Sequence, residues 1–195
     1  MKKTLINVLQ AYLGESQARN RYNFYGKVAK KEGYEQISAL FYTISEQEKT
    51  HGKNFFRMYK QLQKELKITG NEVELEKVHV PTVFETTKEN LKAAIAGENW
   101  EYTTLYPEFA KIAEEEGYPK MAVQIRGIAN AEEHHEEIYK KLLKEIESGT
   151  VFKKDEKVWW VCRECGYVHY GKKPPVNCPS CNHPQAYFQI KCEDF

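Results

Sequence analysis

The chain has 195 residues, of which 41% are apolar, so it can bury a sizeable core in one or two domains. Its 29 Lys and Arg nearly balance its 28 Asp and Glu, and the net charge of +1 gives no sign of a nucleic-acid or anionic-membrane partner. No apolar run approaches the roughly 18 residues of a transmembrane helix.

The first residues have only part of the pattern of a signal peptide. Lys2 and Lys3 precede an apolar stretch, but Asn7, Gln10 and Glu15 interrupt it. We therefore expect no signal peptide, and a cytoplasmic location is the default.

Residues 1 to about 148 have the composition and periodicity of long helices. Ala, Glu, Lys, Leu and Gln recur, with apolar residues three and four positions apart. Glycine-containing turns predict helices at roughly 4–32, 36–67, 84–116 and 119–147. Helices of about 30 residues fit an all-α four-helix bundle, in which 69–83 would form a long extended crossover between the second and third helices.

The two halves of this helical region repeat each other. Ala29–Tyr34 resembles Ala113–Tyr118 at an offset of 84, and at the same offset Glu48–His51 falls on Glu132–His135. The repeat predicts two helical hairpins of common pattern joined by the crossover.

The third helix carries one residue more than the repeat requires. Gly14–Glu15 matches Gly97–Glu98 at an offset of 83, so an extra residue must lie between Glu98 and Gly117. A π-type bulge absorbs one residue without ending a helix. Pro107, which lacks a backbone donor, is the location that we expect.

Acidic and histidine side chains occupy the apolar faces of all four predicted helices. Burying so many ionised carboxylates would be costly unless metal ions compensate their charge. The residues concerned are Glu15, Glu48, His51, Glu98, Glu101, Glu132 and His135.

The spacing of these residues is that of a two-metal site. Glu-x-x-His places two ligands about one turn apart on one helix face. One Glu from each of two helices and Glu-x-x-His from each of the other two is the ligand pattern of di-iron and di-manganese bundles. A single such pair is usually a solvated surface pair, but a complete set at matching positions predicts a site for Fe, Mn or Zn rather than Ca.

All five cysteines lie after residue 161, where the composition changes. Cys162–Cys165 and Cys178–Cys181 are two Cys-x-x-Cys pairs separated by 12 residues, which predicts a tetrahedral four-thiolate site for iron or zinc. Cys192 falls outside this spacing, and we expect a buried or free thiol there.

We expect a bundle at 1–148, a linker at 149–157 and a small metal-stapled β/loop domain at 158–195.

Taken together, these motifs make almost the whole chain similar to the rubrerythrin family. The resemblance implies a ferritin-like di-iron bundle fused to a C-terminal rubredoxin-like domain, with one iron held by Cys162, Cys165, Cys178 and Cys181. The segments that carry it are Gly14–Tyr22, Glu48–His51, Gly97–Glu101, Tyr106–Ala110, Glu132–His135, Trp160–Tyr167 and Asn177–Cys181.

The function that this resemblance implies is that of a non-haem di-iron peroxidase, which reduces hydrogen peroxide to water in the oxidative-stress defence of an anaerobe or microaerophile. Electrons would come from an NAD(P)H-dependent rubredoxin-type reductase or a rubredoxin, through the rubredoxin-like iron. The alternative is a ferroxidase or iron-handling ferritin-like protein, which would gain nothing from an attached redox domain. A purely structural zinc protein is a third hypothesis.

The resemblance also implies a role for each ligand. Glu48 and Glu132 would bridge the two irons, and His51 would replace Glu101 when the first iron is reduced. Tyr22 and Tyr106 would orient the carboxylates, unless they only pack in the core. The remaining ligands would be Glu15 and Glu101 on the first iron, and Glu98 and His135 on the second.

The separation of the two metal sites along the chain favours a head-to-tail homodimer. His135 lies 12 residues before Glu147, the predicted helix end, which is roughly 18 Å of helix. The linker 149–157 extends to about 30 Å at most. Folding back along the bundle remains open, but an antiparallel partner joins the two sites by a closed two-fold contact.

Overall fold

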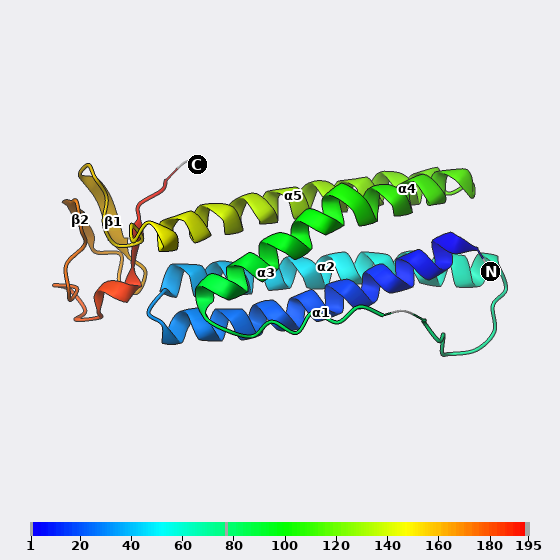
Figure 1. The fold of residues 1–195 in the computed structure, drawn as a ribbon, viewed down its shortest axis with the longest axis horizontal. Helices are drawn as coiled ribbons and strands as arrows, with labels where there is room; N and C mark the ends of the chain where they lie inside the picture. Colours follow the sequence, from blue (N-terminus) through cyan, green and yellow to red (C-terminus); the bar gives the residue numbers. More distant parts are fainter. Residues whose placement is uncertain (1, 77, 194–195) are drawn as a thin grey trace.

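The structure, a computed structural model, describes residues 2–76 and 78–193. Most of this chain is helical, and a small sheet follows the last long helix (Figure 1). Its elements are α1 (Lys3–Lys31), α2 (Glu35–Glu65), α3 (Thr87–Trp100), the π-helix η1 (Glu101–Leu105), α4 (Tyr106–Glu115), α5 (Pro119–Glu147), β1 (Val158–Cys162), β2 (Val168–Gly171), the 3-10 helix η2 (Gln185–Tyr187) and β3 (Phe188–Ile190).

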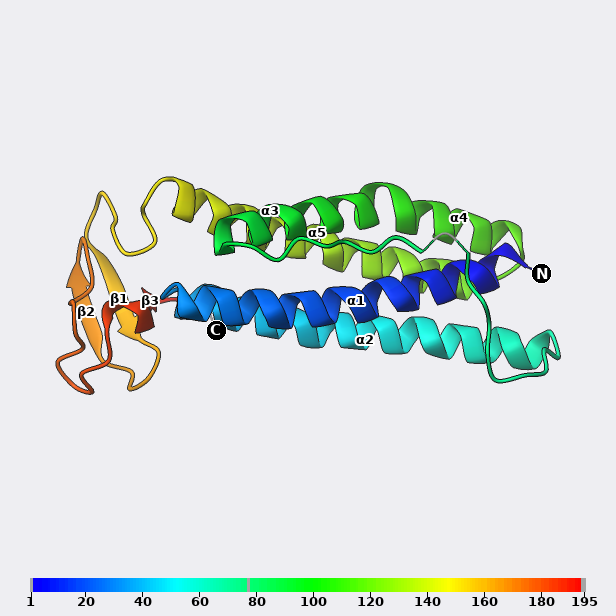
Figure 2. The ribbon, with the colours of Figure 1, turned by 60° about the horizontal axis from the view of Figure 1, so that its bottom comes forward.

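The helices form two hairpins that lie side by side, as predicted. One hairpin is α1 with α2, and the other is α3, η1 and α4 with α5 (Figure 1). The crossover between α2 and α3 contains no helix or strand among its described residues. It returns along the bundle, over α1 in the view of Figure 1 and over α3 and α5 in the view of Figure 2. None of the described helices has the length and apolar character that a membrane span requires.

The third helix begins three residues later than the predicted position 84. Thr86 has an extended backbone and its side chain accepts a hydrogen bond from the amide of Glu89, so it is the N-cap of α3. The chain just before Thr87 therefore stays outside the helix.

The predicted π-type irregularity is confirmed as η1, which ends two residues before Pro107 rather than lying at it. The amide of Tyr106 donates to the carbonyl of Glu101, five residues back. Because Pro107 has no N–H, the return from π to α hydrogen bonding costs no backbone donor there. The extra residue predicted after Glu98 is thus accommodated in η1, which begins at Glu101.

The internal repeat extends to two glutamates, Glu32 and Glu116, that each cap the opposite hairpin at the offset of 84. Glu116, at the end of α4, accepts hydrogen bonds of 2.9 and 3.0 Å from the first amides of α1. Glu32, at the end of α1, accepts 3.2 Å hydrogen bonds from the amide of Thr87 at the start of α3. A carboxylate stabilises a helix N-terminus, so each turn fixes the first turn of the other hairpin.

Two buried apolar clusters fill the bundle on either side of its middle. One cluster contains Phe55 and Leu62, and the other contains Phe41 and Tyr139. These four side chains are essentially inaccessible to solvent. The polar side chains between the clusters are therefore held in dry and closely packed surroundings.

The small C-terminal unit is a three-stranded antiparallel sheet in the order β2-β1-β3. Trp160 is fully buried beneath it and donates a 2.9 Å hydrogen bond to the carbonyl of Gly171. The sheet lies at the end of the bundle where α5 ends (Figures 1 and 2). We propose the division at 148 and 158 on this basis, because α5 ends at Glu147 and β1 begins at Val158.

Candidate metal centres

The structure brings six of the seven predicted bundle ligands together in two groups that overlap. Within each group, one ligand atom per residue lies within 4.8 Å of all the others. Because Glu48 and Glu132 belong to both groups, they stand where carboxylates that bridge two metals would stand. The groups are Glu15, Glu48, His51 and Glu132, and Glu48, Glu98, Glu132 and His135.

A glycine lets the first hairpin close around this site. Gly52 in α2 is buried, and a β-carbon added to it would lie 3.3 Å from the β-carbon of Glu15 in α1. The two helices can therefore approach closely at the level of the carboxylates.

The buried polar atoms of the site converge without hydrogen bonding to one another. Nδ1 of His135 lies 2.8 Å from Glu132 and 3.0 Å from Glu48, and Nδ1 of His51 lies 2.9 Å from Glu132. Among the described residues, these nitrogens and both carboxylate oxygens of Glu48 and Glu132 have no hydrogen-bond partner. Unsatisfied buried polar atoms are costly, so lone pairs directed at a common space fit metal ions.

Burial and mutual repulsion shift the ionisation of the carboxylates. Burial raises the pKa values of Glu15 and Glu101 well above the ordinary value. Burial, followed by the nearby charge of Glu48, raises the pKa of Glu98 to about 8. Burial also disfavours the charged form of Glu48, but the close approach of Glu15 and of the two histidines outweighs it and lowers its pKa. Cations would relieve this repulsion.

The two histidines take up protons more readily than ordinary histidines, because carboxylates surround them. Burial lowers the pKa of His51 and of His135, but their carboxylate neighbours outweigh it. The result is a pKa of about 9 for His51 and about 12 for His135. A metal ion must displace these protons, so binding is expected to weaken as the pH falls.

Two tyrosines hold the terminal carboxylates across the bundle. The hydroxyl of Tyr22 in α1 donates a 2.5 Å hydrogen bond to Glu98 in α3, and the hydroxyl of Tyr106 in α4 donates to Glu15 in α1. Burial raises the pKa of both tyrosines, which keeps them protonated as donors. Both tyrosines predicted from the sequence thus touch predicted ligands.

Glu101 is the predicted ligand that the structure leaves outside both groups. It begins η1, is half-buried, and lies near Gly14, where an added β-carbon would be 3.9 Å from its Oε1. His51 stands in the first group instead. Glu101 therefore lies near the site without belonging to either group, whereas His51 belongs to the first.

Gln47 contacts the site and was not predicted from the sequence. Its Oε1 lies 3.0 Å from Nε2 of His135, so it accepts the Nε2 proton when Nδ1 faces the carboxylates. At the repeat offset of 84, the equivalent residue is Ala131. No described residue hydrogen-bonds Nε2 of His51. Among the described residues, therefore, only the ring of His135 is held by a hydrogen bond at Nε2. Comparing positions 47 and 131 across the repeat could have revealed this difference.

We expect Gln47→Ala to weaken metal binding by about tenfold, because His135 loses the partner that orients its ring. Titration with Co²⁺ of metal-free protein that also carries Cys162→Ser with Cys165→Ser, which removes the four-cysteine site, measures this affinity through the visible absorption of the bound metal. Gln61→Ala is the matched control, because Gln61 is another exposed glutamine of α2. An affinity equal to that of the unmodified protein would remove the positioning role of Gln47.

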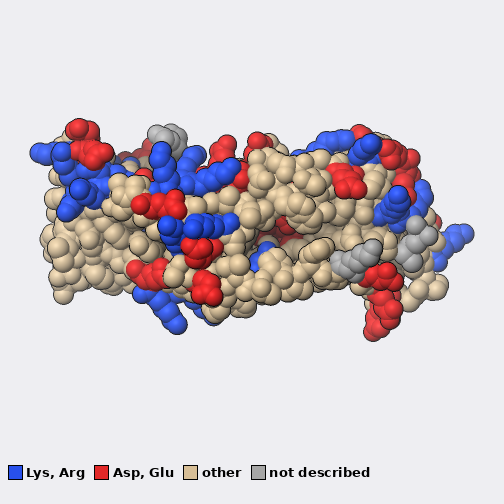
Figure 3. All heavy atoms as spheres, in the orientation of Figure 1, with Lys and Arg blue, Asp and Glu red and all other residues tan. Residues whose placement is uncertain are grey.

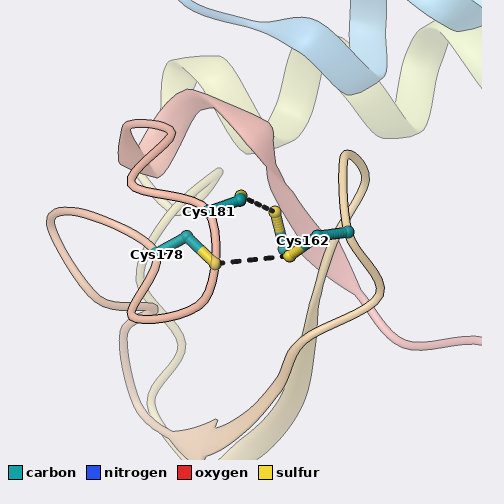
Figure 4. A group of neighbouring side chains, drawn as sticks. Cys162, Cys178 and Cys181 are labelled. Atoms are coloured by element: carbon teal, nitrogen blue, oxygen red, sulfur yellow. Dashed lines mark hydrogen bonds between the residues drawn. The ribbon is translucent and has the colours of Figure 1, made fainter.

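The four cysteines of the two Cys-x-x-Cys pairs form the predicted group. The sulfur of Cys162 lies 3.7 Å from that of Cys181 (Figure 4). The sulfur of Cys165 lies 3.6 Å from that of Cys178. These distances exceed a disulfide bond and suit four thiolates around one ion. Cys192 is exposed rather than buried and lies outside this group.

Two equivalent loops present these sulfurs. The amide of Cys162 donates to the carbonyl of Tyr167, and the amide of Cys178 donates to that of His183, both at 2.8 Å. Gly166 has a φ of +76°, a left-handed conformation that glycine adopts freely. Mainly through a hydrogen bond from the backbone of Tyr167, the pKa of Cys165 falls to about 6, which favours its thiolate.

Comparison with known proteins covers both parts of the chain. Residues 7–143 match the family described as Rubrerythrin, and residues 160–189 match the one described as Rubrerythrin, rubredoxin-like domain. A putative rubrerythrin of Methanocaldococcus jannaschii is 53% identical over 195 residues, which cover 100% of this chain and 96% of the relative. The rubrerythrin of Nitratidesulfovibrio vulgaris is 42% identical over 188 residues, which cover 96% and 94%.

Solved structures agree with this assignment. Fully reduced nigerythrin has a TM-score of 0.64 and 28% identity, and the match covers 98% of this chain and 88% of that one. The ligands present fit a di-iron centre in the bundle and one iron bound by the four cysteines. This fit, the ferritin-like fold and the relatives support a redox function at iron. The chain therefore belongs to the rubrerythrin family.

Proposed function

We propose that this protein is a non-haem di-iron peroxidase that reduces hydrogen peroxide to water in the cytoplasm. The observation that carries the proposal is the presence, in one chain, of a carboxylate-rich two-metal site and a four-cysteine site. When bound, a pair of ferrous ions supplies both electrons that cleavage of the O–O bond consumes. A protein that only stores or oxidises iron has no need of the second site.

The bundle's own side chains prepare the site for this reaction. Glu48 and Glu132 would hold both metals at once, since each belongs to both ligand groups. Tyr22 and Tyr106 keep Glu98 and Glu15 in place through their hydroxyl protons. The apolar clusters pack along the bundle on either side of the carboxylates.

We propose that His51 and Glu101 alternate as ligands of the first metal. An anionic carboxylate suits the ferric state, and a neutral imidazole suits the ferrous state. The side chain of His51 is 12% exposed, against 3% for His135, and no described residue fixes its Nε2 from behind. His51 is therefore the histidine with more freedom to move toward and away from the site.

The working unit that we propose is a head-to-tail homodimer. The C-terminal unit that carries the four cysteines lies at one end of the bundle (Figure 1). The carboxylates lie between the two apolar clusters. Transfer of electrons from the partner's four-cysteine iron would shorten the path to the di-iron site. An NAD(P)H-dependent reductase or a rubredoxin would reduce that iron.

Steady-state turnover tests this function. Iron-loaded protein is mixed with NADH, a rubredoxin reductase, rubredoxin and hydrogen peroxide, and NADH oxidation is followed. We expect peroxide-dependent oxidation that Glu48→Ala with Glu132→Ala abolishes. Iron oxidation and storage without donor-coupled peroxide turnover would instead identify a ferroxidase, and a colourless protein lacking iron would identify a structural zinc protein.

A further inference from the structure

A pocket of about 300 Å³ opens beside the proposed di-iron site. It lies between α1, the crossover and the segment from Trp100 to Phe109. Figure 3 shows a hollow near the middle of the bundle, with acidic atoms visible inside it. The two apolar clusters leave this side of the site open.

The inner end of the pocket reaches residues of the site. Glu101, the proposed exchange ligand, and Tyr106, which donates to Glu15, both line it. Gly14 lines it as well, and a β-carbon there would meet no atom closer than 3.9 Å, at Glu101. A molecule in the pocket could therefore place one end against the reacting centre.

The pocket is larger and more apolar than a site for hydrogen peroxide alone requires. A water-sized molecule takes up about 30 Å³, roughly a tenth of this space. Pockets that bind organic molecules begin at about 300 Å³ and are mostly apolar. Leu13, Leu105 and Phe109 supply such walls here, while Gln17 and His79 add polar groups.

We propose that this pocket holds the organic part of alkyl hydroperoxides, so that the protein reduces them as well as hydrogen peroxide. The inference rests on the proposed peroxidase function. In this reaction the O–O bond of the hydroperoxide breaks, and two electrons from the ferrous pair and two protons are consumed. The oxygen on carbon leaves as an alcohol and the other as water, and the rubredoxin-type donor restores the electrons.

The test compares cumene hydroperoxide with hydrogen peroxide in the donor-coupled assay. Leu13 is half-buried in the pocket wall, so Leu13→Trp should narrow the pocket and Leu13→Ala should widen it. We expect Leu13→Trp to lower the ratio of kcat/KM for cumene hydroperoxide to that for hydrogen peroxide by about tenfold. Leu13→Ala is expected not to lower it. Val123→Trp, on an exposed position of α5 outside the pocket, is the matched control.

A binding measurement separates the pocket from the chemistry. Calorimetric titration with 2-phenyl-2-propanol, the alcohol product, should show binding to the iron-loaded protein that Leu13→Trp weakens and Val123→Trp does not. Turnover of hydrogen peroxide without turnover of cumene hydroperoxide would overturn the pocket proposal and leave the peroxidase intact. Turnover of neither would overturn the peroxidase itself. An unchanged ratio in Leu13→Trp would show that alkyl groups bind elsewhere.

Discussion

Replacing His51 by alanine is expected to impair peroxide reduction far more than iron binding. Five carboxylates and His135 remain in the variant to hold two metals. What the variant lacks is the neutral ligand proposed for the ferrous state of the first iron. We expect roughly 10- to 100-fold lower kcat with hydrogen peroxide, with most of the iron per subunit retained.

The matched control for this variant is His134→Ala. His134 is an exposed histidine of α5 that lies outside both ligand groups, so its loss should change neither activity nor iron content. Full activity of His51→Ala, or parallel loss of iron and activity, would contradict the exchange of His51 for Glu101.

Mixed dimers should recover activity that each parent lacks. One subunit carries Cys162→Ser with Cys165→Ser and loses the four-cysteine iron, and the other carries Glu48→Ala with Glu132→Ala and loses the di-iron site. Each homodimer should be inactive as a donor-coupled peroxidase. A heterodimer pairs the intact di-iron site of one subunit with the intact four-cysteine site of the other. Head-to-tail transfer would restore about half of the unmodified dimer's activity, since one of its two routes remains.

This experiment distinguishes the two routes because transfer within a subunit cannot operate in the heterodimer. Different affinity tags on the two subunits allow the mixed species to be purified and its iron content measured. A heterodimer that forms and carries iron at both intact sites, yet stays inactive, would contradict electron transfer between subunits.

The bundle and its ligand set could be predicted because they follow from local patterns. Glutamates such as Glu48 and Glu132 lie on helix faces that are otherwise apolar. Because a charge does not fit the apolar pattern of such a face, these positions indicate bound metal ions. The change of offset from 84 to 83 located the π-helix within the third helix, because comparing equivalent positions of the two repeats shows where one residue has been added. Both inferences use spacing along one helix.

Other contacts between helices, apart from those of Tyr22 and Tyr106, were not predicted. Gln47 occupies an exposed position of α2 and becomes relevant only because α5 brings His135 against it. The caps by Glu32 and Glu116 likewise join segments more than 50 residues apart. The late start of α3 had a local signal, since Thr86 and Glu89 have the spacing of a capping box.

The most direct test of the central claim is a single reaction without an external donor. Fully reduced, iron-loaded protein is mixed anaerobically with hydrogen peroxide while the colour of the ferric four-cysteine iron is followed. Electrons that pass from this iron through the di-iron site to peroxide should make the colour appear, with one peroxide consumed per two electrons. Glu48→Ala with Glu132→Ala should prevent both changes. A four-cysteine iron that stays reduced while peroxide persists would contradict the account.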